Sequence, residues 1–284
     1  MIDVLEFLAA PFVACLLLGA ILGYLGIHVL TRRVIFVDLA LAQIAALGTL
    51  LGVLRGHDPG SPGSLAYSLG AALFGAAVFS WTRTRRERVP QEAIIGITYV
   101  IASALAILVA DRAPEGAEHI QELLAGAILW VTWPAVLRDF LVFAGVGLLH
   151  YVLRQRFTMI SSNPEEAFRQ GLSVRLWDFL FYASFGVVIT LAVSVGGVLM
   201  VFTYLVAPAI LAVGFADGWR HRMCIAWSAS FLASALGLAA SYRWDFPSGP
   251  AVVCTLGVIL VLAAMFRILR PGPALRCAPT GPEK

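Results

Sequence analysis

Two clusters of polar residues interrupt an otherwise apolar sequence, and the first has the composition of a metal site. Glu118, His119 and Glu122 stand close together between apolar stretches. His119 and Glu122 are three residues apart, and imidazole and carboxylate groups are common ligands of zinc and related divalent metals. His119 and Glu122 are therefore the best candidate pair of metal ligands in the sequence, with Glu118 beside them. The alternative is that, like Asp111 and Glu115 before them, they are solvated loop charges.

The second cluster, residues 161–171, has the signals of a short capped helix. Asn163 is a favoured N-cap, Pro164 suits the first helical position, and two glutamates follow where the helix dipole favours negative charge. Gly171 suits the end of the helix. Such a helix between two apolar segments would be a rigid handle for another protein. The alternative is an interfacial helix that only joins the two segments.

Sequence motifs for catalysis are absent. The sequence has no GxxxxGK[ST] loop for ATP, no HExxH metalloprotease motif and no GxSxG nucleophile elbow. No catalytic residue is therefore expected, and energy for any driven process would come from a partner chain or an ion gradient. We interpret His28 and His150, each near the end of an apolar stretch, as hydrogen-bonded or interfacial residues rather than metal ligands.

The elements that must position these polar residues are membrane helices. Of the 284 residues, 60% are hydrophobic and only 13% are charged, and the mean hydropathy is +0.87. Soluble domains carry roughly a quarter charged residues, so a water-soluble globule is excluded. The net charge of +3 does not indicate nucleic-acid binding, because the arginines fall between apolar runs instead of forming a patch.

The apolar stretches predict an all-α, polytopic membrane protein with eight to nine transmembrane helices. Stretches near the ~20 residues needed to cross a bilayer occur at about 7–30, 34–54, 64–82, 93–110, 134–153, 177–195, 198–216, 223–241 and 249–268. The stretches 177–195 and 198–216 are separated only by Gly196-Gly197. This pair could be a hairpin turn, a break within one irregular helix or a re-entrant element. Glycines such as Gly26 and Gly70 are expected to allow close helix packing.

The distribution of arginines predicts the orientation of the chain, because cytoplasmic loops are enriched in basic residues. Fifteen of the 20 basic residues fall in alternate loops, namely Arg32, Arg33, Arg83, Arg85, Arg86, Arg88, Arg154, Arg156, Arg169, Arg175, Arg220, Arg222, Arg267, Arg270 and Arg276. This pattern requires an even number of crossings between Arg175 and Arg220. We therefore favour nine crossings, an outside N-terminus and a cytoplasmic C-terminus. The proline-rich tail, 271–284, is expected to be disordered.

Several sequence blocks resemble permeases of the zinc, manganese and iron family of ABC importers. The blocks are 25–37 with 40–43, 92–97, 123–129, 195–199 with 208–209, and 245–250. The resemblance runs from about residue 7 to residue 268 and implies a type II ABC importer-like permease domain at 1–270. It also implies that the segment at about 161–172 is the coupling helix that docks into an ATPase. The implied coupling residues are Asn163, Pro164, Glu165, Glu166, Ala167 and Gly171.

One departure from the family concerns the translocation path. Many members carry an Asp and a His four residues apart on the second span, where this chain has Leu39 and Gln43. Gln43 offers either a weak carbonyl ligand or an interhelical hydrogen bond. Asp38 is turned about 100 degrees away and is expected either in the path or in an ion pair with Arg32 or its neighbour. Asp245 matches the family pattern and is expected to set turn or gate geometry.

The resemblance further implies an assembly in the bacterial cytoplasmic membrane. Two copies of this chain would form the path for zinc, manganese or iron, ATPase subunits would bind ATP, and a periplasmic or lipid-anchored solute-binding protein would deliver the cargo. This chain itself would hold no cofactor. Two alternatives are an ion-gradient-driven secondary transporter and an ABC permease for a metal chelate. The first is disfavoured because Asp38 is the only acidic residue well inside a span, Asp139 and Asp178 lying near span ends.

Overall fold

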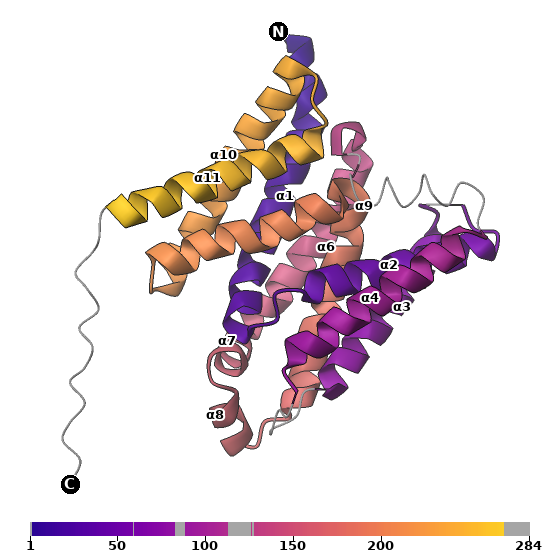
Figure 1. Ribbon diagram of the computed structural model, residues 1–284, viewed down its shortest axis with the longest axis vertical. Coiled ribbons are helices and arrows are strands. Elements are labelled where there is room, and N and C mark those ends of the chain that lie inside the picture. Colours follow the sequence, from indigo (N-terminus) through magenta and orange to yellow (C-terminus); the bar gives the residue numbers. More distant parts are fainter. Residues whose placement is uncertain (1, 59, 83–88, 113–125, 127, 270–284) are drawn as a thin grey trace.

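The computed structural model describes residues 2–58, 60–82, 89–112, 126 and 128–269. Within these residues the chain is built from helices, and no strand occurs. The helices are α1 (Ile2–Arg32), α2 (Val37–Leu54), α3 (Pro62–Thr82), α4 (Gln91–Ala110), η1 (Ile128–Trp130), α6 (Trp133–Val152), α7 (Arg154–Ser162), α8 (Pro164–Arg169), α9 (Val174–Phe215), α10 (Trp219–Trp244) and α11 (Ser248–Leu269). Figure 1 shows their arrangement, with α8 and the N-terminus at opposite ends of the molecule.

Eight of the described helices are long and apolar enough to cross a membrane, which confirms the predicted fold class. The 42-residue α9 is broken at Gly197, whose φ of 73° and ψ of 162° are accessible essentially only to glycine. We call residues 174–196 α9a and residues 198–215 α9b. At 1.5 Å per residue they span roughly 34 Å and 27 Å, each about enough to cross the hydrocarbon core. The helix changes direction sharply part-way along its length (Figure 1).

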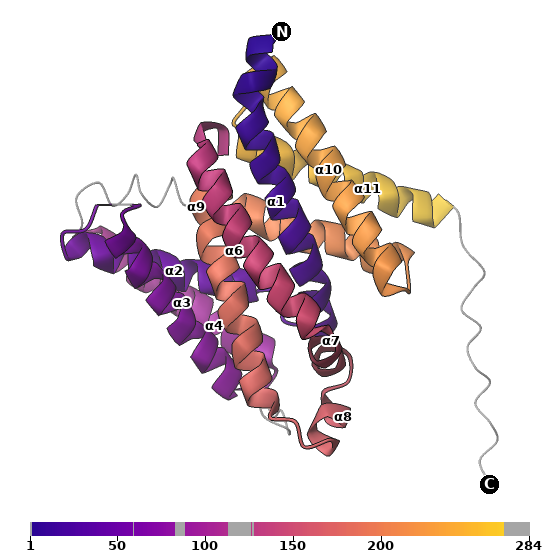
Figure 2. The ribbon, with the colours of Figure 1, turned by 180° about the vertical axis from the view of Figure 1, so that it is seen from behind.

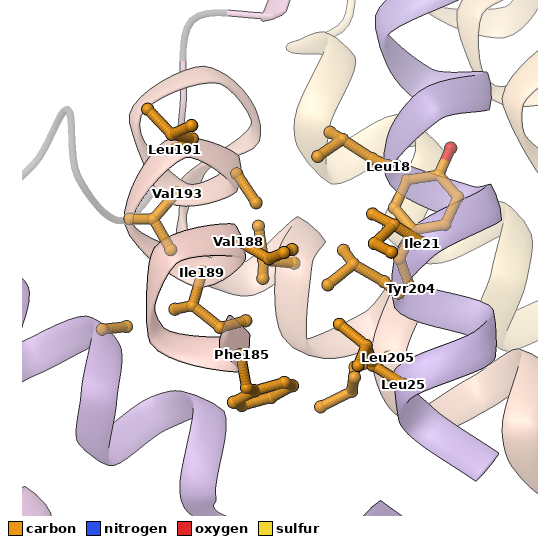
Figure 3. Close-up of a cluster of buried hydrophobic side chains, with 14 of the residues drawn as sticks. Leu18, Ile21, Leu25, Phe185, Val188, Ile189, Leu191, Val193, Tyr204 and Leu205 are labelled. Atoms are coloured by element: carbon orange, nitrogen blue, oxygen red, sulfur yellow. The ribbon is translucent and has the colours of Figure 1, made fainter. Parts of the chain in front are cut away.

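The core of the bundle lies between α1 and the two halves of α9. Figure 3 shows side chains of α9a, such as Phe185 and Val188, facing a group from α1 and α9b that contains Leu18, Ile21, Leu25, Tyr204 and Leu205. Within the most apolar part of each helix, 67% of residues are buried in α1 and 78% in α9, against 22% in α4 and 11% in α11. The central helices are therefore α1 and α9, and α4 and α11 are peripheral.

Glycine allows the closest approach between central helices. A Cβ added at Gly26 would lie 1.9 Å from the backbone oxygen of Leu205, so only glycine fits between α1 and α9b. Gly70 in α3 has open space around it, and its lack of a side chain is not needed for packing in the single chain. The expected close packing is thus present at Gly26 and absent at Gly70.

The helix ends that carry most arginines meet at the end of the bundle that holds α7 and α8. The Ser80 hydroxyl donates to the backbone oxygen of Arg175 at 2.8 Å, which joins the end of α3 to the start of α9a. The rings of His28 and Trp219, 4.8 Å apart, join the end of α1 to the start of α10. We call this the basic end; its described arginines include Arg32, Arg154, Arg156, Arg169, Arg175 and Arg220. The opposite end, with the α10–α11 turn, is the far end.

Candidate functional site

The segment at the tip of the basic end is a short helix, α8, capped on both sides. The side-chain oxygen of Asn163 accepts a hydrogen bond from the backbone N–H of Glu166 at 3.2 Å. After the helix, Gly171 has a φ of 73°, the left-handed conformation that favours glycine. The Ala167 side chain is fully buried between Ile160 and Val174 and anchors α8 to the bundle. The sequence signals for a cap, a start and a stop thus match the local geometry.

Charged and polar groups of α8 point away from this anchor. Glu165, Arg169 and Gln170 are exposed, and the Glu166 carboxylate is partly so. Arg169 and Gln170 both donate hydrogen bonds to Glu166, and these bonds lower the pKa of the Glu166 carboxyl. The outer face of α8 therefore presents a carboxylate in its charged form, held by side chains of the same segment.

The boundaries of the predicted coupling helix need correction. The expected helix covered about 161–172, but α8 runs only over Pro164–Arg169, and residues 161 and 162 end the preceding helix α7. Asn163 separates the two helices with non-helical backbone, φ −146° and ψ 78°. Ser161 is buried, so it belongs to the bundle and not to the exposed docking surface. The cap at Asn163 is what ends one helix and starts the next.

A buried ion pair ties α1 to α9a directly above this segment. The Arg32 guanidinium donates to the Asp178 carboxylate at 2.6 Å, and both side chains are fully buried. The guanidinium also lies 3.9 Å from the ring centre of Phe181, and its Nε donates to Ser161 at 2.9 Å. Arg32 thereby connects α1, α7 and α9a. The sequence placed Arg32 and Asp178 near span ends, but their pairing follows only from the folded arrangement.

Two histidines extend this network into the bundle. His28 contacts the Ser161 hydroxyl at 3.0 Å and the Tyr24 hydroxyl at 3.1 Å through its two ring nitrogens. Tyr24 also contacts His150, 3.3 Å away, and His150 contacts Ser184 at 2.8 Å. Both histidines are buried and hydrogen-bonded, as interpreted from the sequence. We call Tyr24, His28, Arg32, His150, Ser161, Asp178 and Ser184 the polar network.

Asp38 lies apart from the polar network. It is buried in the first turn of α2, and its Oδ1 has no hydrogen-bond partner among the described residues. The expected ion pair with Arg32 is wrong, because Arg32 turns to Asp178 instead, and Asp38 forms no ion pair within the described part of the chain. A buried acceptor without a donor is costly. Asp38 therefore remains a candidate for a role other than stability.

The other predicted path residues are scattered. Gln43 is half-buried, as is Leu39 one turn earlier, and no hydrogen bond of the Gln43 side chain occurs among the described residues. Asp245 ends α10 at the far end, exposed, with a φ of 55°, and its N–H donates to Ser241. The structure therefore gives Asp245 a turn geometry and does not bring it to Asp38.

The metal cluster expected from the sequence lies outside the described residues, since Glu118, His119 and Glu122 all fall in 113–125. Among the residues that the structure does describe, no three His, Cys, Asp or Glu side chains are grouped as a metal site. Among the described residues, α8 is thus an exposed, charged helix with a buried anchor, and the polar network lies between it and the helices α1 and α9a.

A comparison with a family model decides what kind of protein carries this short capped helix. The model of the ABC 3 transport family matches residues 4–267. The chain belongs to this family. Membership confirms the resemblance drawn from the sequence blocks, and it sets aside the alternative of an ion-gradient-driven secondary transporter.

Relatives of the permease match it almost from end to end. It is 23% identical over 266 residues to the manganese transport system membrane protein MntC of Listeria innocua, covering 92% of this chain and 90% of that protein. It is 22% identical over 276 residues to the chelated iron transport system membrane protein YfeD of Yersinia pestis, covering 96% and 90%. The solved structure of PsaBC from Streptococcus pneumoniae in complex with Fab has the same fold, with a TM-score of 0.75, 21% identity, and 92% and 93% of the two chains covered.

Proposed function

We propose that this permease is the membrane-spanning subunit of an ABC importer and that α8 docks into a separate ATPase chain. The observation that carries the proposal is the construction of α8. Its inner side is anchored by the buried Ala167, while Glu165, Glu166 and Arg169 lie on the outer side. A rigid helix with a fixed base and a charged outer face is suited to receive a push from another protein.

The polar network supplies the route for that push. Ser161 lies two residues before Asn163, and it bonds to Arg32 and His28 of α1. Arg32 in turn holds Asp178 of α9a. A displacement of α8 is therefore passed to the two central helices of the bundle, because buried, fully packed contacts transmit movement instead of absorbing it. ATP binding to the docked ATPase would rock α1 and α9a against the peripheral helices.

A second copy of the permease completes the path in this proposal. Leu39, Gln43 and Leu51 lie on one face of α2, and Leu51 is 42% exposed in the single chain. A homodimer would close a path along this face. The basic end, with its arginines and α8, would then face the cytoplasm. The permease would lie in the bacterial cytoplasmic membrane. A solute-binding protein would deliver the cargo to its far end, on the outer side.

The proposed cargo is a divalent metal ion, manganese, iron or zinc. Support comes from the relatives, two of which are named as manganese and chelated iron transport system proteins. Uptake of radioactive Mn²⁺, Zn²⁺ and Fe²⁺ into proteoliposomes that hold the permease, its ATPase and its binding protein tests this directly. ATP-dependent uptake of one of the ions is expected, and uptake of none of them would contradict it.

A metal chelate is a second candidate cargo, favoured by one observation on α2. Leu39 and Gln43 occupy the positions where many family members carry metal-binding Asp and His, and leucine offers no ligand. A cargo that brings its own ligands would need fewer from the path. Chelated and free ions should be compared in the same uptake assay, where faster transport of the chelate would favour this candidate.

Docking at α8 is tested by co-purification of the ATPase with permease variants. Glu166→Ala removes the carboxylate that organises the outer face of α8, and Gly171→Val strains the left-handed stop. Each should reduce the amount of co-purified ATPase at least about tenfold, the size expected at an interface hot spot. Asp217→Ala, an exposed carboxylate in the α9–α10 turn, is the matched control and should bind normally. Normal co-purification of both α8 variants, with membrane insertion intact, would contradict the docking site.

A further inference from the structure

A membrane-facing groove near the basic end is not used by the docking site or by the path along α2. Its volume is about 820 Å³, and α1, α6, α7 and α10 line it. Figure 2 shows α6, α1 and α10 side by side on this face of the bundle. Most of the lining is apolar, from Leu17 and Ile21 of α1, Phe140 and Phe143 of α6, and Trp227 of α10. The groove is therefore suited to a hydrocarbon chain.

The length of the groove matches one leaflet of a membrane. On α6 the lining runs from Phe140 to Tyr151, which corresponds to roughly 16 Å at 1.5 Å per residue. This is about half of the ~30 Å hydrocarbon core of a bilayer. The groove also begins at the basic end, where α7 follows α6, and it stops near the middle of the bundle. An acyl chain of a lipid in that leaflet would lie along its full length.

The polar lining of the groove lies at its basic end and is positively charged. Arg154 and Arg220 come from α7 and α10, and both are exposed. Neither forms an ion pair with a carboxylate in the part of the chain that the structure describes. The Arg154 guanidinium lies 4.6 Å from the ring centre of Tyr151. Trp219 is a second aromatic residue in the lining of the groove. Tyrosine and tryptophan at this depth are typical of the headgroup region.

We propose that this groove binds an anionic phospholipid from the leaflet at the basic end. The headgroup phosphate lies between Arg154 and Arg220, and one acyl chain lies along α6 between Phe140 and Tyr151. Basic pockets between membrane helices select acidic headgroups in this way. A second copy of the chain is a poorer occupant, because a twofold contact would bring the same unpaired arginines together. The site does not depend on the proposed cargo or on the ATPase.

Native mass spectrometry of the purified permease tests the headgroup half of the proposal. Delipidated protein is titrated with dioleoylphosphatidylglycerol or with dioleoylphosphatidylcholine, which differ in headgroup charge. We expect one phosphatidylglycerol per chain to bind at least about tenfold more tightly than phosphatidylcholine, and the variant Arg154→Gln with Arg220→Gln to lose this preference. The control Arg175→Gln with Arg267→Gln removes two basic-end charges outside the groove and should keep it. Equal binding of both lipids by the wild-type permease would overturn the proposal.

A side chain that fills the groove tests whether the acyl chain binds there, while Arg154 and Arg220 are left unchanged. A Cβ at Gly147 meets no atom within 4 Å, and Gly147 lines the groove, so Gly147→Leu projects a side chain into it. Gly145→Leu is the matched control, because Gly145 has equal space on the same helix and does not line the groove. Gly147→Leu should weaken phosphatidylglycerol binding about tenfold and Gly145→Leu should not. Unchanged binding by a monodisperse Gly147→Leu permease would also overturn the proposal.

Discussion

The two ends of the bundle are held together by different means. At the basic end, the side-chain contacts of the polar network that leave α1 join residues that are 126 to 146 positions apart in sequence. At the far end, the side-chain hydrogen bonds at the described helix ends are local, such as the one from Ser241 to the backbone of Phe246 at 2.7 Å. Among the long-range contacts toward that end, Gly126 packs against the backbone of Gly196 and Gly197, and the Phe12 ring packs edge-on against the Phe231 ring of α10, 5.8 Å away. Long-range polar contacts thus hold the basic end, and close backbone and ring packing contributes toward the far end.

This difference fits the tasks that we propose for the two ends. Directional hydrogen bonds and a buried ion pair fix one geometry, so the basic end can pass a movement of α8 to α1 and α9a as a unit. The contact of Gly126 with Gly196 and Gly197 involves glycines, which have no side chain to form a directional bond, so it should constrain the far end less strictly. Four predictions follow the comparison from the largest expected change in stability to the smallest.

The largest effect is expected from breaking the buried ion pair. Arg32→Ala leaves the Asp178 carboxylate without its guanidinium, and removal of one partner of a buried pair costs about 3–5 kcal/mol. The free energy of unfolding in mixed micelles is the measurement. The double variant Arg32→Met with Asp178→Leu should recover most of the stability, because no charge stays buried. An Arg32→Ala permease as stable as wild type would contradict the claim that the Arg32–Asp178 ion pair stabilises the basic end.

A smaller loss is expected at the far end from Gly126→Ala. Gly126 has a φ of 71°, and an added Cβ would lie 2.3 Å from the backbone carbon of Gly196. Left-handed strain and overpacking together predict a loss of about 3 kcal/mol. The control is Gly257→Ala in α11, where open space surrounds the added methyl and stability should not fall. If both variants unfold alike, the glycine contact does not hold the far end.

Ser161→Ala probes a single hydroxyl of the polar network. His28 and the Nε of Arg32 both bond to this hydroxyl, so its removal leaves buried polar atoms unpaired and should cost about 2 kcal/mol. Ser162→Ala changes the adjacent, exposed serine and should lie within about 0.5 kcal/mol of wild type. Equal thermal unfolding of the two variants would show that Ser161 does not join α7 to α1.

The docking variant Glu166→Ala should have the smallest effect on stability. Glu166 lies on the outer face of α8, so its loss should leave the free energy of unfolding close to that of the wild type. The ATPase should nevertheless be lost on purification. This split between stability and docking separates α8 from the polar network. A Glu166→Ala permease that is as strongly destabilised as the Arg32→Ala variant would make α8 part of the core instead.

Long apolar runs and strong local signals were sufficient to predict most of the fold. The spans follow from hydrophobicity and length, and the Gly196-Gly197 pair located the break in α9 because glycine alone adopts the conformation seen at Gly197. Asn163 and Gly171 located α8 because caps act through bonds between near neighbours. Helix α7 was missed, since its polar sequence follows α6 without a capping side chain or an apolar repeat.

The polar network could not be predicted from the sequence, because its contacts join residues that are far apart in the chain. Arg32 and Asp178 were both visible near span ends, but Asp38 is closer to Arg32 in sequence and was the natural partner to choose. Which carboxylate the guanidinium meets depends on how α1 packs on α9a, and no local pattern encodes that. One signal was available: opposite charges near the basic ends of two different spans have reason to pair in a membrane.

The most direct test of the account is the sidedness of the two ends. In a background without the four cysteines, the variants Gln170→Cys and Asp245→Cys each place one exposed thiol, after α8 and at the far end respectively. An impermeant maleimide added to intact spheroplasts should label the Asp245→Cys variant at once and the Gln170→Cys variant only after the membrane is permeabilised. Labelling of the Gln170→Cys variant from outside would place α8 beyond the reach of any cytoplasmic ATPase and would contradict the account.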